Sequence, residues 1–359
     1  MMTNFATERE IRQQPQIWRD FAPALAQQAD ALRGWIAARN HDEVWFCGAG
    51  TSAFIGESLA VTLNAGPGSV RFRAVPSTDL VGTPQNYLRD GVRVLVVSFG
   101  RSGNSSESVG SLDLLDAHAP GHDRLHITCN AGSVLATRAM PDGAAGQFRA
   151  LILPPETEDA GFAMTSSYTT MYLSALSVFA PPADGVVAQW RRVADAAEAV
   201  IAQGFAQVPG LPERAVFLGA GALAGAAREC ALKVLELTAG QVLTMFDTPL
   251  GFRHGPKAVV NGNTQIFVLG SADAQTARYE ADLIDELGRQ YDAGLVTRLG
   301  PFDGLDDAWS VPLHVIPAQI LALQWAQALG LNADDPFAGR NLTRVVSGVT
   351  LYPFDRGAA

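Results

Sequence analysis

Two short apolar segments that end in the same Gly-Ala-Gly turn place the tightest constraint on the fold. The first reads EVWFCGAG over residues 43–50, and the second reads AVFLGAG over residues 215–221. Further strand-like segments follow the first copy at 70–76, 92–98, 123–130 and 148–155, and the second copy at 265–271 and 293–300. Because helix-favouring segments separate these stretches, the pattern predicts parallel sheets with helices on both faces. We therefore expect an α/β fold made of two related, doubly wound halves.

Three longer helices are expected around these halves. Residues 1–40 read as helix, with Thr7 and Glu10 at capping-box spacing, and Pro15 is expected to kink or divide it. A helical stretch from Val186 to Ala206 connects the halves, and a further helix begins at Gln319.

The charge pattern argues against nucleic acid and membrane partners. The formal net charge is −10, only 17% of residues are charged, and no run of Lys or Arg occurs. No apolar stretch reaches membrane-spanning length, and the first residues lack the features of a signal peptide. The three scattered cysteines have no metal-ligand spacing, which indicates reduced thiols. We expect a soluble cytoplasmic protein.

The first Gly-Ala-Gly turn continues into Thr51 and Ser52, which open a predicted helix. Gly50, these two hydroxyls and the amides of the helix N-terminus suit a phosphate group. A nicotinamide dinucleotide site is the alternative, because Gly48-x-Gly50-x-x-Ala53 fits the loose fingerprint. Against it, no acidic residue ends the second strand, and Asp79 lies well beyond the expected spacing.

The loop FGRSGNSSES at 99–108 separates these alternatives better. It gathers serines, among them Ser102 and Ser105, around two glycines at the start of a helix. Hydroxyls and amides that converge in this way can surround a phosphate dianion without a metal ion. Serine, asparagine and glycine are also ordinary loop residues. Two such loops in one half nevertheless favour a sugar-phosphate pocket, and Met164-Thr-Ser-Ser167 adds a third polar patch.

The segment AARECALKVLELTAG carries the candidate acid/base groups. Cys230, Val234 and Leu237 form one apolar stripe, and Glu229, Lys233 and Glu236 repeat its spacing on a neighbouring face. On residue types alone, Glu229 and Lys233 read as a solvated i,i+4 pair. In an active site, Glu236 with Lys233 three residues before it is a usable pair for moving a proton.

His254 lies in the Gly/Pro-bounded loop GFRHGPK, where its ring can meet a ligand. The other histidines carry no metal-ligand motif, and we expect no metal or organic cofactor. His41, His118 and His122 lie in polar connections and are expected to be solvated, whereas His126 and His314 lie in apolar strand-like runs and are expected in the core.

Taken together, the strings GAGTSAFIG, SFGRSGNSSESV, GFAMTSS, ARECALKVLELTAG and GFRHGPK resemble those of proteins with two tandem SIS (sugar isomerase) domains. The similarity covers nearly the whole chain and is greatest to AgaS-type galactosamine-6-phosphate deaminases and tagatose-6-phosphate ketose/aldose isomerases. It implies two flavodoxin-like domains, each a parallel sheet flanked by helices. The implied segments are a helical start at 1–40, a first SIS domain at 41–183, a connecting helix at 184–206, a second SIS domain at 207–335, and a tail at 336–359 that closes the active site.

The resemblance also implies roles for individual residues. Glu236 matches the carboxylate that moves a proton between C1 and C2, Lys233 is its neighbour, and His254 matches the ring-opening residue, which reaches in from the other subunit of a homodimer. The residues implied to bind the sugar phosphate are Gly50, Thr51, Ser52, Gly100, Arg101, Ser102, Ser105, Ser166, Ser167 and Arg344.

This chain departs from the related glucosamine-6-phosphate synthases at three of these positions. Gly100 replaces a phosphate-binding Ser, Arg101 replaces a Gln, and Arg344 replaces a Lys. The chain also has no glutamine amidotransferase domain, so the resemblance points to the direction that releases ammonia.

The expected reaction is therefore the deaminating isomerisation of D-galactosamine 6-phosphate to D-tagatose 6-phosphate and ammonia. Plain tagatose-6-phosphate isomerisation and glucosamine-6-phosphate deamination are the alternatives. SIS domains also occur in non-catalytic sugar-phosphate sensors, but the short N-terminal segment has no basic recognition helix, and the presence of both Glu236 and His254 favours catalysis.

Overall fold

The computed structural model describes residues 5–207, 210–339 and 342–357. The chain divides into two compact units. We call them the five-stranded unit (Phe21–Glu158, Ser167–Val186 and Leu342–Ala359) and the four-stranded unit (Met1–Asp20, Asp159–Ser166 and Val187–Asn341).

The five-stranded unit contains a fully parallel sheet of order β2-β1-β3-β4-β5. Its strands are β1 (Glu43–Cys47), β2 (Arg71–Ala74), β3 (Val94–Gly100), β4 (Asp123–Thr128) and β5 (Phe148–Ile152). The three strands β1, β3 and β4 are buried throughout, which explains their nearly continuous apolar sequences. All five lie where the sequence predicts them.

The four-stranded unit contains a second parallel sheet of order β7-β6-β8-β9. Its strands are β6 (Arg214–Leu218), β7 (Leu243–Asp247), β8 (Thr264–Leu269) and β9 (Val296–Leu299). The sequence analysis did not predict β7. This strand lies at the sheet edge and is partly exposed, and its short apolar sequence follows α8 after only a few residues.

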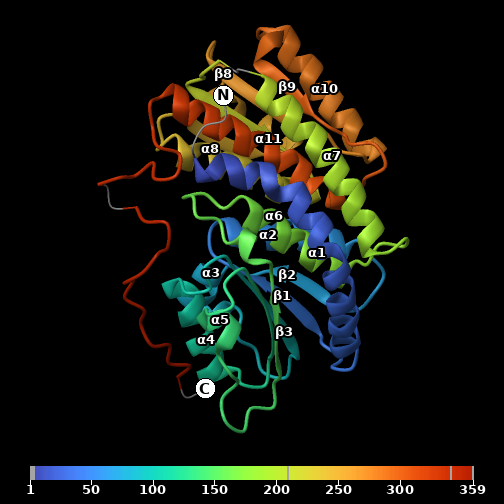
Figure 1. Cartoon of the computed structure of the whole chain (residues 1–359), viewed down its shortest axis with the longest axis vertical. Coiled ribbons are helices and arrows are strands. Elements are labelled where there is room, and N and C mark those ends of the chain that lie inside the picture. The colour runs from blue at the N-terminus through green and yellow to red at the C-terminus, as the bar shows by residue number, and fades with distance from the viewer. Residues whose placement is uncertain (1–4, 208–209, 340–341, 358–359) are drawn as a thin grey trace. The chain divides into compact units, whose positions relative to one another are not determined.

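Helices lie between the strands in both units (Figure 1). They are α1 (Ala6–Ala37), α2 (Thr51–Asn64), α3 (Ser77–Gly82), α4 (Ser106–His118), α5 (Val134–Thr137), α6 (Ser166–Phe179), α7 (Val186–Ala206), α8 (Ala222–Leu237), α9 (Pro249–Phe252), α10 (Ala274–Gln290) and α11 (Asp307–Ala328), with short 3₁₀ turns at Pro84–Asn86, Pro155–Thr157, Pro256–Val259 and Ala293–Leu295. Together the two sheets confirm the predicted α/β fold of two doubly wound halves.

Pro15 does not divide the helix, because α1 runs without interruption through it, and the kink expected at Pro15 stays a prediction. Ile11 and Trp18, on either side of Pro15, are both completely buried, so packing offsets the hydrogen bond that proline cannot make. The expected capping box was also wrong. Asp334, from the turn after α11, accepts hydrogen bonds from the amides of Ala6 (2.7 Å) and Thr7 (2.9 Å) and from the Thr7 hydroxyl (2.7 Å).

Several helices, the short α5 and α9 among them, differ from the expectation in existence or length. The helix expected from Gln319 begins at Asp307, where Asp306 caps it, and it continues through Pro312 and Pro317. These prolines masked its first half in the sequence. Helices α6 and α10 were not predicted.

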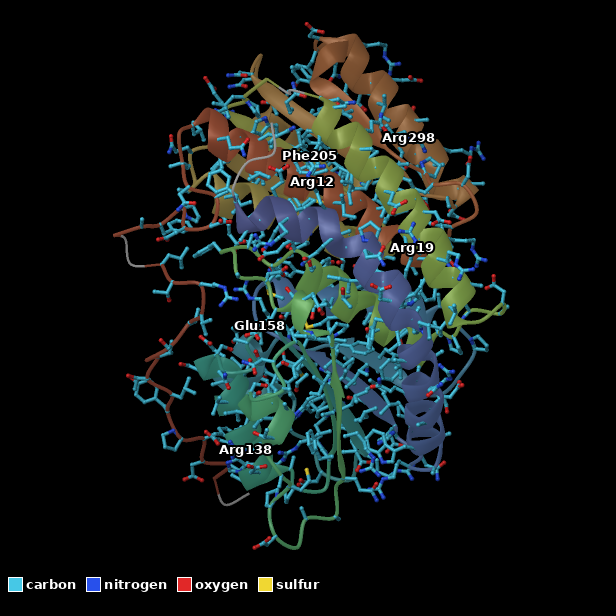
Figure 2. The ribbon with its side chains drawn as sticks, viewed as in Figure 1. Arg12, Arg19, Arg138, Glu158, Phe205 and Arg298 are labelled. Carbon is cyan, nitrogen blue, oxygen red and sulfur yellow. The ribbon has the colours of Figure 1, made fainter. Side chains whose placement is uncertain are left out.

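Contacts between α1 and α7 belong to the four-stranded unit. The Arg12 guanidinium lies 3.7 Å from the centre of the Phe205 ring, and Arg19 pairs with Asp195 (2.6 Å) and Glu198 (2.5 Å) (Figure 2). Both acids are well exposed, so the cation–π contact and the buried stripe of α1 hold this face more firmly than the ion pairs do.

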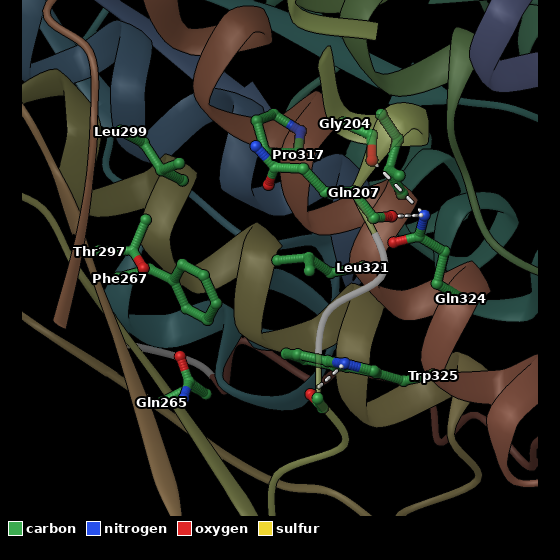
Figure 3. A pocket seen from close by; sticks show the side chains of 12 residues that line it. Gly204, Gln207, Gln265, Phe267, Thr297, Leu299, Pro317, Leu321, Gln324 and Trp325 are labelled. Atoms are coloured by element: carbon green, nitrogen blue, oxygen red, sulfur yellow. Dashed lines mark hydrogen bonds between the residues drawn. The ribbon is translucent and has the colours of Figure 1, made fainter. Parts of the chain in front are cut away.

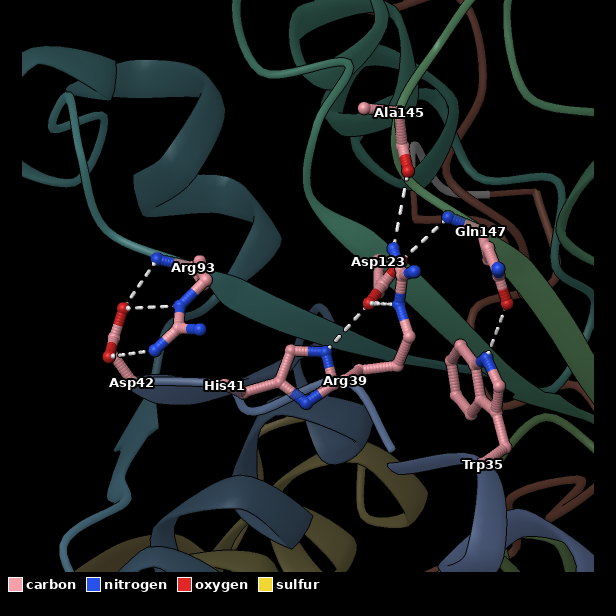
Figure 4. Close-up of polar contacts among 8 residues, drawn as sticks. All are labelled: Trp35, Arg39, His41, Asp42, Arg93, Asp123, Ala145 and Gln147. Atoms are coloured by element: carbon pink, nitrogen blue, oxygen red, sulfur yellow. Dashed lines mark hydrogen bonds and ion pairs between the residues drawn. The ribbon is translucent and has the colours of Figure 1, made fainter. Parts of the chain in front are cut away.

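Two of the histidines expected to be solvated are buried. His41 donates or accepts through Nε2 at 2.8 Å from Asp123, which also accepts from the Arg39 side chain (2.7 Å) and the Gln147 amide (2.6 Å) (Figure 4). His122 packs edge-on against Trp45. The expectation that these two histidines are solvated was wrong. Polar residues next to them in the sequence do not show that they pack against residues of other strands.

His126 and His314 are buried as expected, although His314 lies in α11 and not in a strand. Burial lowers the pKa of His314 to about 3, and the pKa values of His126 and His122 to about 4. Among the described residues neither ring nitrogen of His314 has a hydrogen-bond partner, and its ring packs against Phe302.

We predict that these histidines make the fold sensitive to acid. Their folded-state pKa values lie below the ordinary value, so the unfolded chain binds more protons as pH falls below about 6.5, and stability is lost from there toward about pH 4. Each contributes a loss of about 2 kcal/mol at pH 5. Replacement of His314 by Leu should therefore reduce the fall in free energy of unfolding between pH 7.5 and pH 5, measured by urea denaturation. An equally steep fall in His314→Leu would contradict this.

Candidate functional site

The turn of residues 48–52 lies where β1 ends, beside β3. Strand order reverses between these neighbouring strands, and ligands of open α/β sheets bind at such a reversal. Gly48 has no room for a side chain, since an added Cβ would lie 2.6 Å from the Ser52 backbone. Gly50 has φ 54° and ψ −128° and caps α2 without a side chain. Thr51 and Ser52, both buried, therefore begin the helix directly at this edge.

The four-stranded unit repeats this turn with different chemistry. Gly221 has φ 57° and ψ −128° and caps α8, and an added Cβ on Gly219 would lie 2.2 Å from the Leu223 carbonyl oxygen. The backbone repeat predicted from sequence is thus present. However, Ala222 and Leu223 stand where the first turn has Thr51 and Ser52, so the second turn offers no hydroxyls.

The loop that follows β3 begins a second helix at the same edge. Ser105 is the N-cap residue of α4, and its hydroxyl lies 2.8 Å from that of Ser108. The Ser102 hydroxyl accepts from the Asn104 amide at 3.3 Å. Gly103 has φ 62° and fits tightly against Ser133, whose Oγ would lie 2.4 Å from an added Cβ. The loop is therefore a fixed turn that presents hydroxyls beside a helix N-terminus.

The corresponding loop after β8 is occupied by the protein's own carboxylates. Glu280 accepts from the Ser271 amide (3.1 Å), Asp307 accepts from the Ala272 amide (2.7 Å), and Asp273 caps α10. The amides that an anionic ligand would need there already bind these carboxylates. The hydroxyl-lined loops of the five-stranded unit suit a phosphate far better.

Arg101, Gly100 and Arg344 belong to the same five-stranded unit. Arg101 is buried, and its guanidinium donates to the Arg344 carbonyl oxygen at 3.1 Å. An added Cβ on Gly100 would lie 2.7 Å from a Leu135 methyl group and 3.1 Å from Gly103. Gly100 therefore packs closely against Leu135 and Gly103.

The final stretch of chain also packs on this unit. The Val346 carbonyl accepts from the Ser106 amide at 3.2 Å, Leu351 lies against Gly110 of α4, and Phe354 packs against His118. Figure 1 shows this stretch, in red, beside α3 and α4. His118 is therefore partly covered and not fully solvated.

Three charged side chains on α8 form a mostly buried cluster. Lys233 is 1% exposed, and its ammonium lies 2.8 Å from Glu236 and 3.3 Å from Glu229. Glu229 is completely buried, whereas the Glu236 side chain is 22% exposed. The interpretation of Glu229 and Lys233 as a solvated pair was wrong, because α8 packs against both α11 and the strands of its sheet.

This arrangement leaves Glu236 as the accessible member of the cluster. Lys233 holds one carboxylate oxygen of Glu236 in place, and the buried Glu229 balances the ammonium charge. Lys233 thus fixes the orientation of a partly exposed carboxylate, and a general acid/base needs such positioning.

His254 follows α9 in a loop whose neighbours are anchored. Arg253 pairs with Asp282 (2.7 Å) and Glu286 (2.8 Å) on α10, and Lys257 pairs with Glu286. His254 itself is exposed. Among the described residues, no hydrogen bond or ion pair joins His254 to Glu236.

Ser166 and Ser167 are both buried at the start of α6. The Ser166 hydroxyl donates to the Glu10 carbonyl (2.8 Å) and accepts from the Gln13 side chain (3.1 Å). The sequence analysis did not identify these partners on α1. The only sequence signal for these partners is the polar string EIRQQP inside a predicted helix. It indicates buried polar residues but not which residues they contact.

A cavity of about 210 Å³ lies elsewhere in the four-stranded unit (Figure 3). Phe267, Leu321 and Trp325 line it together with the amides of Gln265 and Gln324. None of the predicted site residues lines it. Within the described chain, no group of three or more His, Cys, Asp or Glu side chains is arranged to hold a metal ion.

Comparison with known proteins places the chain in a family. Residues 39–180 match the SIS domain family. The chain is 38% identical over 364 residues to the D-galactosamine-6-phosphate deaminase AgaS of Shewanella sp. (strain ANA-3), with 98% of this chain and 92% of that protein covered. This chain belongs to the AgaS family of SIS-domain proteins.

Other members support the same assignment. The D-galactosamine-6-phosphate deaminase AgaS of Escherichia coli is 39% identical over 376 residues, covering 97% of this chain and 96% of that protein. The crystal structure of tagatose-6-phosphate ketose/aldose isomerase from Escherichia coli superposes with a TM-score of 0.86 at 37% identity, covering 98% of this chain and 97% of that one. The predicted SIS family and fold are thus confirmed.

We predict that Lys233 stabilises the fold by neutralising Glu229. Lys233→Met should lower the free energy of unfolding by about 3–5 kcal/mol, because it leaves a buried carboxylate without its cation. The double variant Glu229→Gln/Lys233→Met should recover most of that loss. Lys257→Met, which removes a partly exposed ion pair, is the control and should cost less than about 1 kcal/mol. Equal losses in the Lys233 and Lys257 variants, measured by urea denaturation, would contradict the prediction.

Proposed function

We propose that this protein converts D-galactosamine 6-phosphate and water into D-tagatose 6-phosphate and ammonia. The observation that carries the proposal is the buried Lys233, which fixes the partly exposed carboxylate of Glu236. The AgaS relatives named as D-galactosamine-6-phosphate deaminases support the same reaction.

In this reaction, His254 acts as acid and base to open the sugar ring. Glu236 then removes the C2 proton of the open aldehyde and returns a proton at C1, while O1 is protonated and the amine becomes a C2 imine. Water adds to the imine carbon, ammonia leaves, and a ketose 6-phosphate remains. Lys233 keeps Glu236 in the orientation that this transfer needs.

The proposed phosphate site consists of Gly50, Thr51, Ser52, Ser102 and Ser105. Two helix N-termini and several hydroxyls at the β1/β3 edge support this assignment. The residues proposed to complete substrate binding are Gly100, Arg101, Ser166, Ser167 and Arg344. The backbone contacts of residues 344 and 346 with Arg101 and Ser106 support a tail that closes over this site.

We further propose that residues 41–183 and 207–335 are the two SIS domains, with 1–40 as the helical start, 184–206 as the connecting helix and 336–359 as the tail. The family match over 39–180 supports the first of these domains. Cys47 and Cys230 are buried thiols that form no disulfide, which supports the proposed cytoplasmic location. None of the described helices is long and apolar enough to span a membrane.

Plain ketose/aldose isomerisation of tagatose 6-phosphate is the second candidate. The similarity to the Escherichia coli tagatose-6-phosphate ketose/aldose isomerase favours it. The same acid/base residues would serve, because only the substituent at C2 differs.

A coupled assay of ammonia release tests the proposal. We expect ammonia from galactosamine 6-phosphate, and none from glucosamine 6-phosphate if the site selects the galacto configuration at C4. Ammonia from glucosamine 6-phosphate alone would mean that the proposed substrate is wrong and that the proposed deamination is right. Release from neither substrate would overturn the deaminase, and tagatose 6-phosphate would then test the isomerase.

The Glu236→Gln variant is the decisive control for this assay. It should lower kcat by about 10²–10⁴-fold, because the positioned base is lost, while substrate binding persists. Asp285→Asn removes an exposed carboxylate from α10 of the same unit and should leave kcat unchanged. Near-normal turnover by Glu236→Gln would refute the assignment of the base.

We propose that the protein is a homodimer with its active site at the subunit interface. The edge strand β7 exposes Leu243 (56%) and Phe246 (45%), and α9 exposes Leu250 (44%) shortly before the exposed His254. Light scattering after gel filtration should give a dimer mass for the wild type and a monomer mass for Leu243→Asp/Phe246→Asp. Val61→Asp, at an exposed apolar position on α2, should remain dimeric. A monomeric wild type would overturn the proposal.

A further inference from the structure

Glu10 lies in the EIRQQP string of α1 and is 4% exposed, although the sequence analysis gives it no chemical role. Its carboxylate accepts hydrogen bonds from the backbone amides of Ala160, at 2.7 Å, and Gly161, at 3.3 Å. A buried carboxylate that is bound to loop amides fixes the path of that loop.

The same residue also holds the far end of this segment. The Ser166 hydroxyl donates to the Glu10 carbonyl oxygen at 2.8 Å and accepts from the Gln13 side chain at 3.1 Å. Glu10 therefore contacts both ends of residues 160–166, through its side chain and its backbone.

Asp159 closes the segment on itself. It accepts from the Thr165 amide (2.7 Å), the Thr165 hydroxyl (2.8 Å) and the Ser166 amide (3.0 Å). At Gly161 an added Cβ would lie 2.6 Å from the Thr7 hydroxyl and 3.0 Å from the Glu10 carboxylate. Close packing thus brings the amide of residue 161 within reach of Glu10.

The surroundings of Glu10 disfavour its charge. Burial, and then the Asp159 carboxylate, raise the pKa of Glu10 to about 7, against the opposing effect of the Ala160 and Gly161 amides. Asp334, from the turn after α11, faces the same carboxylate and raises the pKa further. A carboxylate so placed changes charge near neutral pH.

We propose that Glu10 is a positioning residue, whose ionised carboxylate holds residues 159–166 in the conformation that binds the sugar phosphate. This inference rests on the proposed function, in which Ser166 contacts the substrate. Its structural part, that Glu10 orders the segment, stands apart from the chemistry and can be measured without turnover.

The proposal has a definite pH dependence. Above about pH 7 the ionised Glu10 accepts charge-assisted hydrogen bonds from the two amides, and these weaken as pH falls through 7 and the carboxyl group takes up a proton. Substrate affinity should therefore decline on the acidic side. Glu10→Gln keeps the size of the side chain and is neutral at every pH.

The test compares the KM of Glu10→Gln with that of the wild type at pH 8 and at pH 6. At each pH we take the ratio of the variant KM to the wild-type KM. The substrate phosphate also titrates near pH 6, but its ionisation affects both KM values equally and therefore does not change this ratio. We expect a ratio of about five at pH 8, the effect of weakening one such hydrogen bond, and a ratio near one at pH 6. Asp20→Asn, an exposed carboxylate on α1, should give a ratio of one at both values.

Hydrogen–deuterium exchange of residues 159–166 is the readout that needs no activity. Exchange should be faster in Glu10→Gln than in the wild type at pH 8, with a smaller difference at pH 6. If exchange changes but no substrate is turned over by the wild type, the proposed function fails and the ordering role remains. Unchanged exchange and an unchanged KM ratio would overturn the role of Glu10.

Gly161→Ala provides a second variant if Glu10→Gln does not fold. The added methyl group should push the segment away from Glu10 and speed exchange at both pH values, without altering a titratable group. Protection equal to that of the wild type in this variant would contradict the proposed contact.

Discussion

The ammonium group of Lys233 is the point on which the chemistry of α8 depends. It is almost completely buried, and the carboxylates of Glu229 and Glu236 offset the cost of burying its charge. Because Glu229 lies inside and Glu236 reaches the surface, the same ion cluster both completes the packing of the helix and presents a fixed carboxylate. The packing of α8 and the orientation of the Glu236 carboxylate are therefore coupled over about two turns of helix.

The two sheets use one backbone turn for different purposes. Gly50 and Gly221 have nearly the same φ and ψ, and each begins a helix at the carboxyl edge of its sheet. In the five-stranded unit, hydroxyl side chains follow the turn. In the four-stranded unit, apolar residues follow it, and Glu280 and Asp307 bind the amides of the neighbouring loop. The backbone path of the two turns is nearly the same. Their side chains differ, and for this reason the turn of the five-stranded unit suits an anion better than that of the four-stranded unit.

Carboxylates that bind backbone amides recur through the four-stranded unit. Asp334 holds the start of α1, Asp159 holds the start of α6, and Glu10 binds the segment between Asp159 and Ser166. Each supplies an acceptor to amides that a helix or loop cannot satisfy by itself. Burial, and after it the negative charges of Asp159 and Asp334, raise the pKa of Glu10 to about 7.

The sequence by itself determined the α/β class, the repeated Gly-Ala-Gly turn, the positions of the central strands and the residues that carry the candidate chemistry. These features are local: buried strands read as apolar runs, and glycines mark turns that other residues cannot form. Only the tertiary structure decided the burial of Lys233 and Glu229, the edge strand β7, and the contacts of Asp334 and Glu10. Each of these depends on residues distant in the chain, or on a position at the margin of a sheet. Contacts between distant residues and a position at a sheet edge leave no periodic pattern in the sequence. The polar contacts depend on how the backbone folds and not on the residues next to them in the chain.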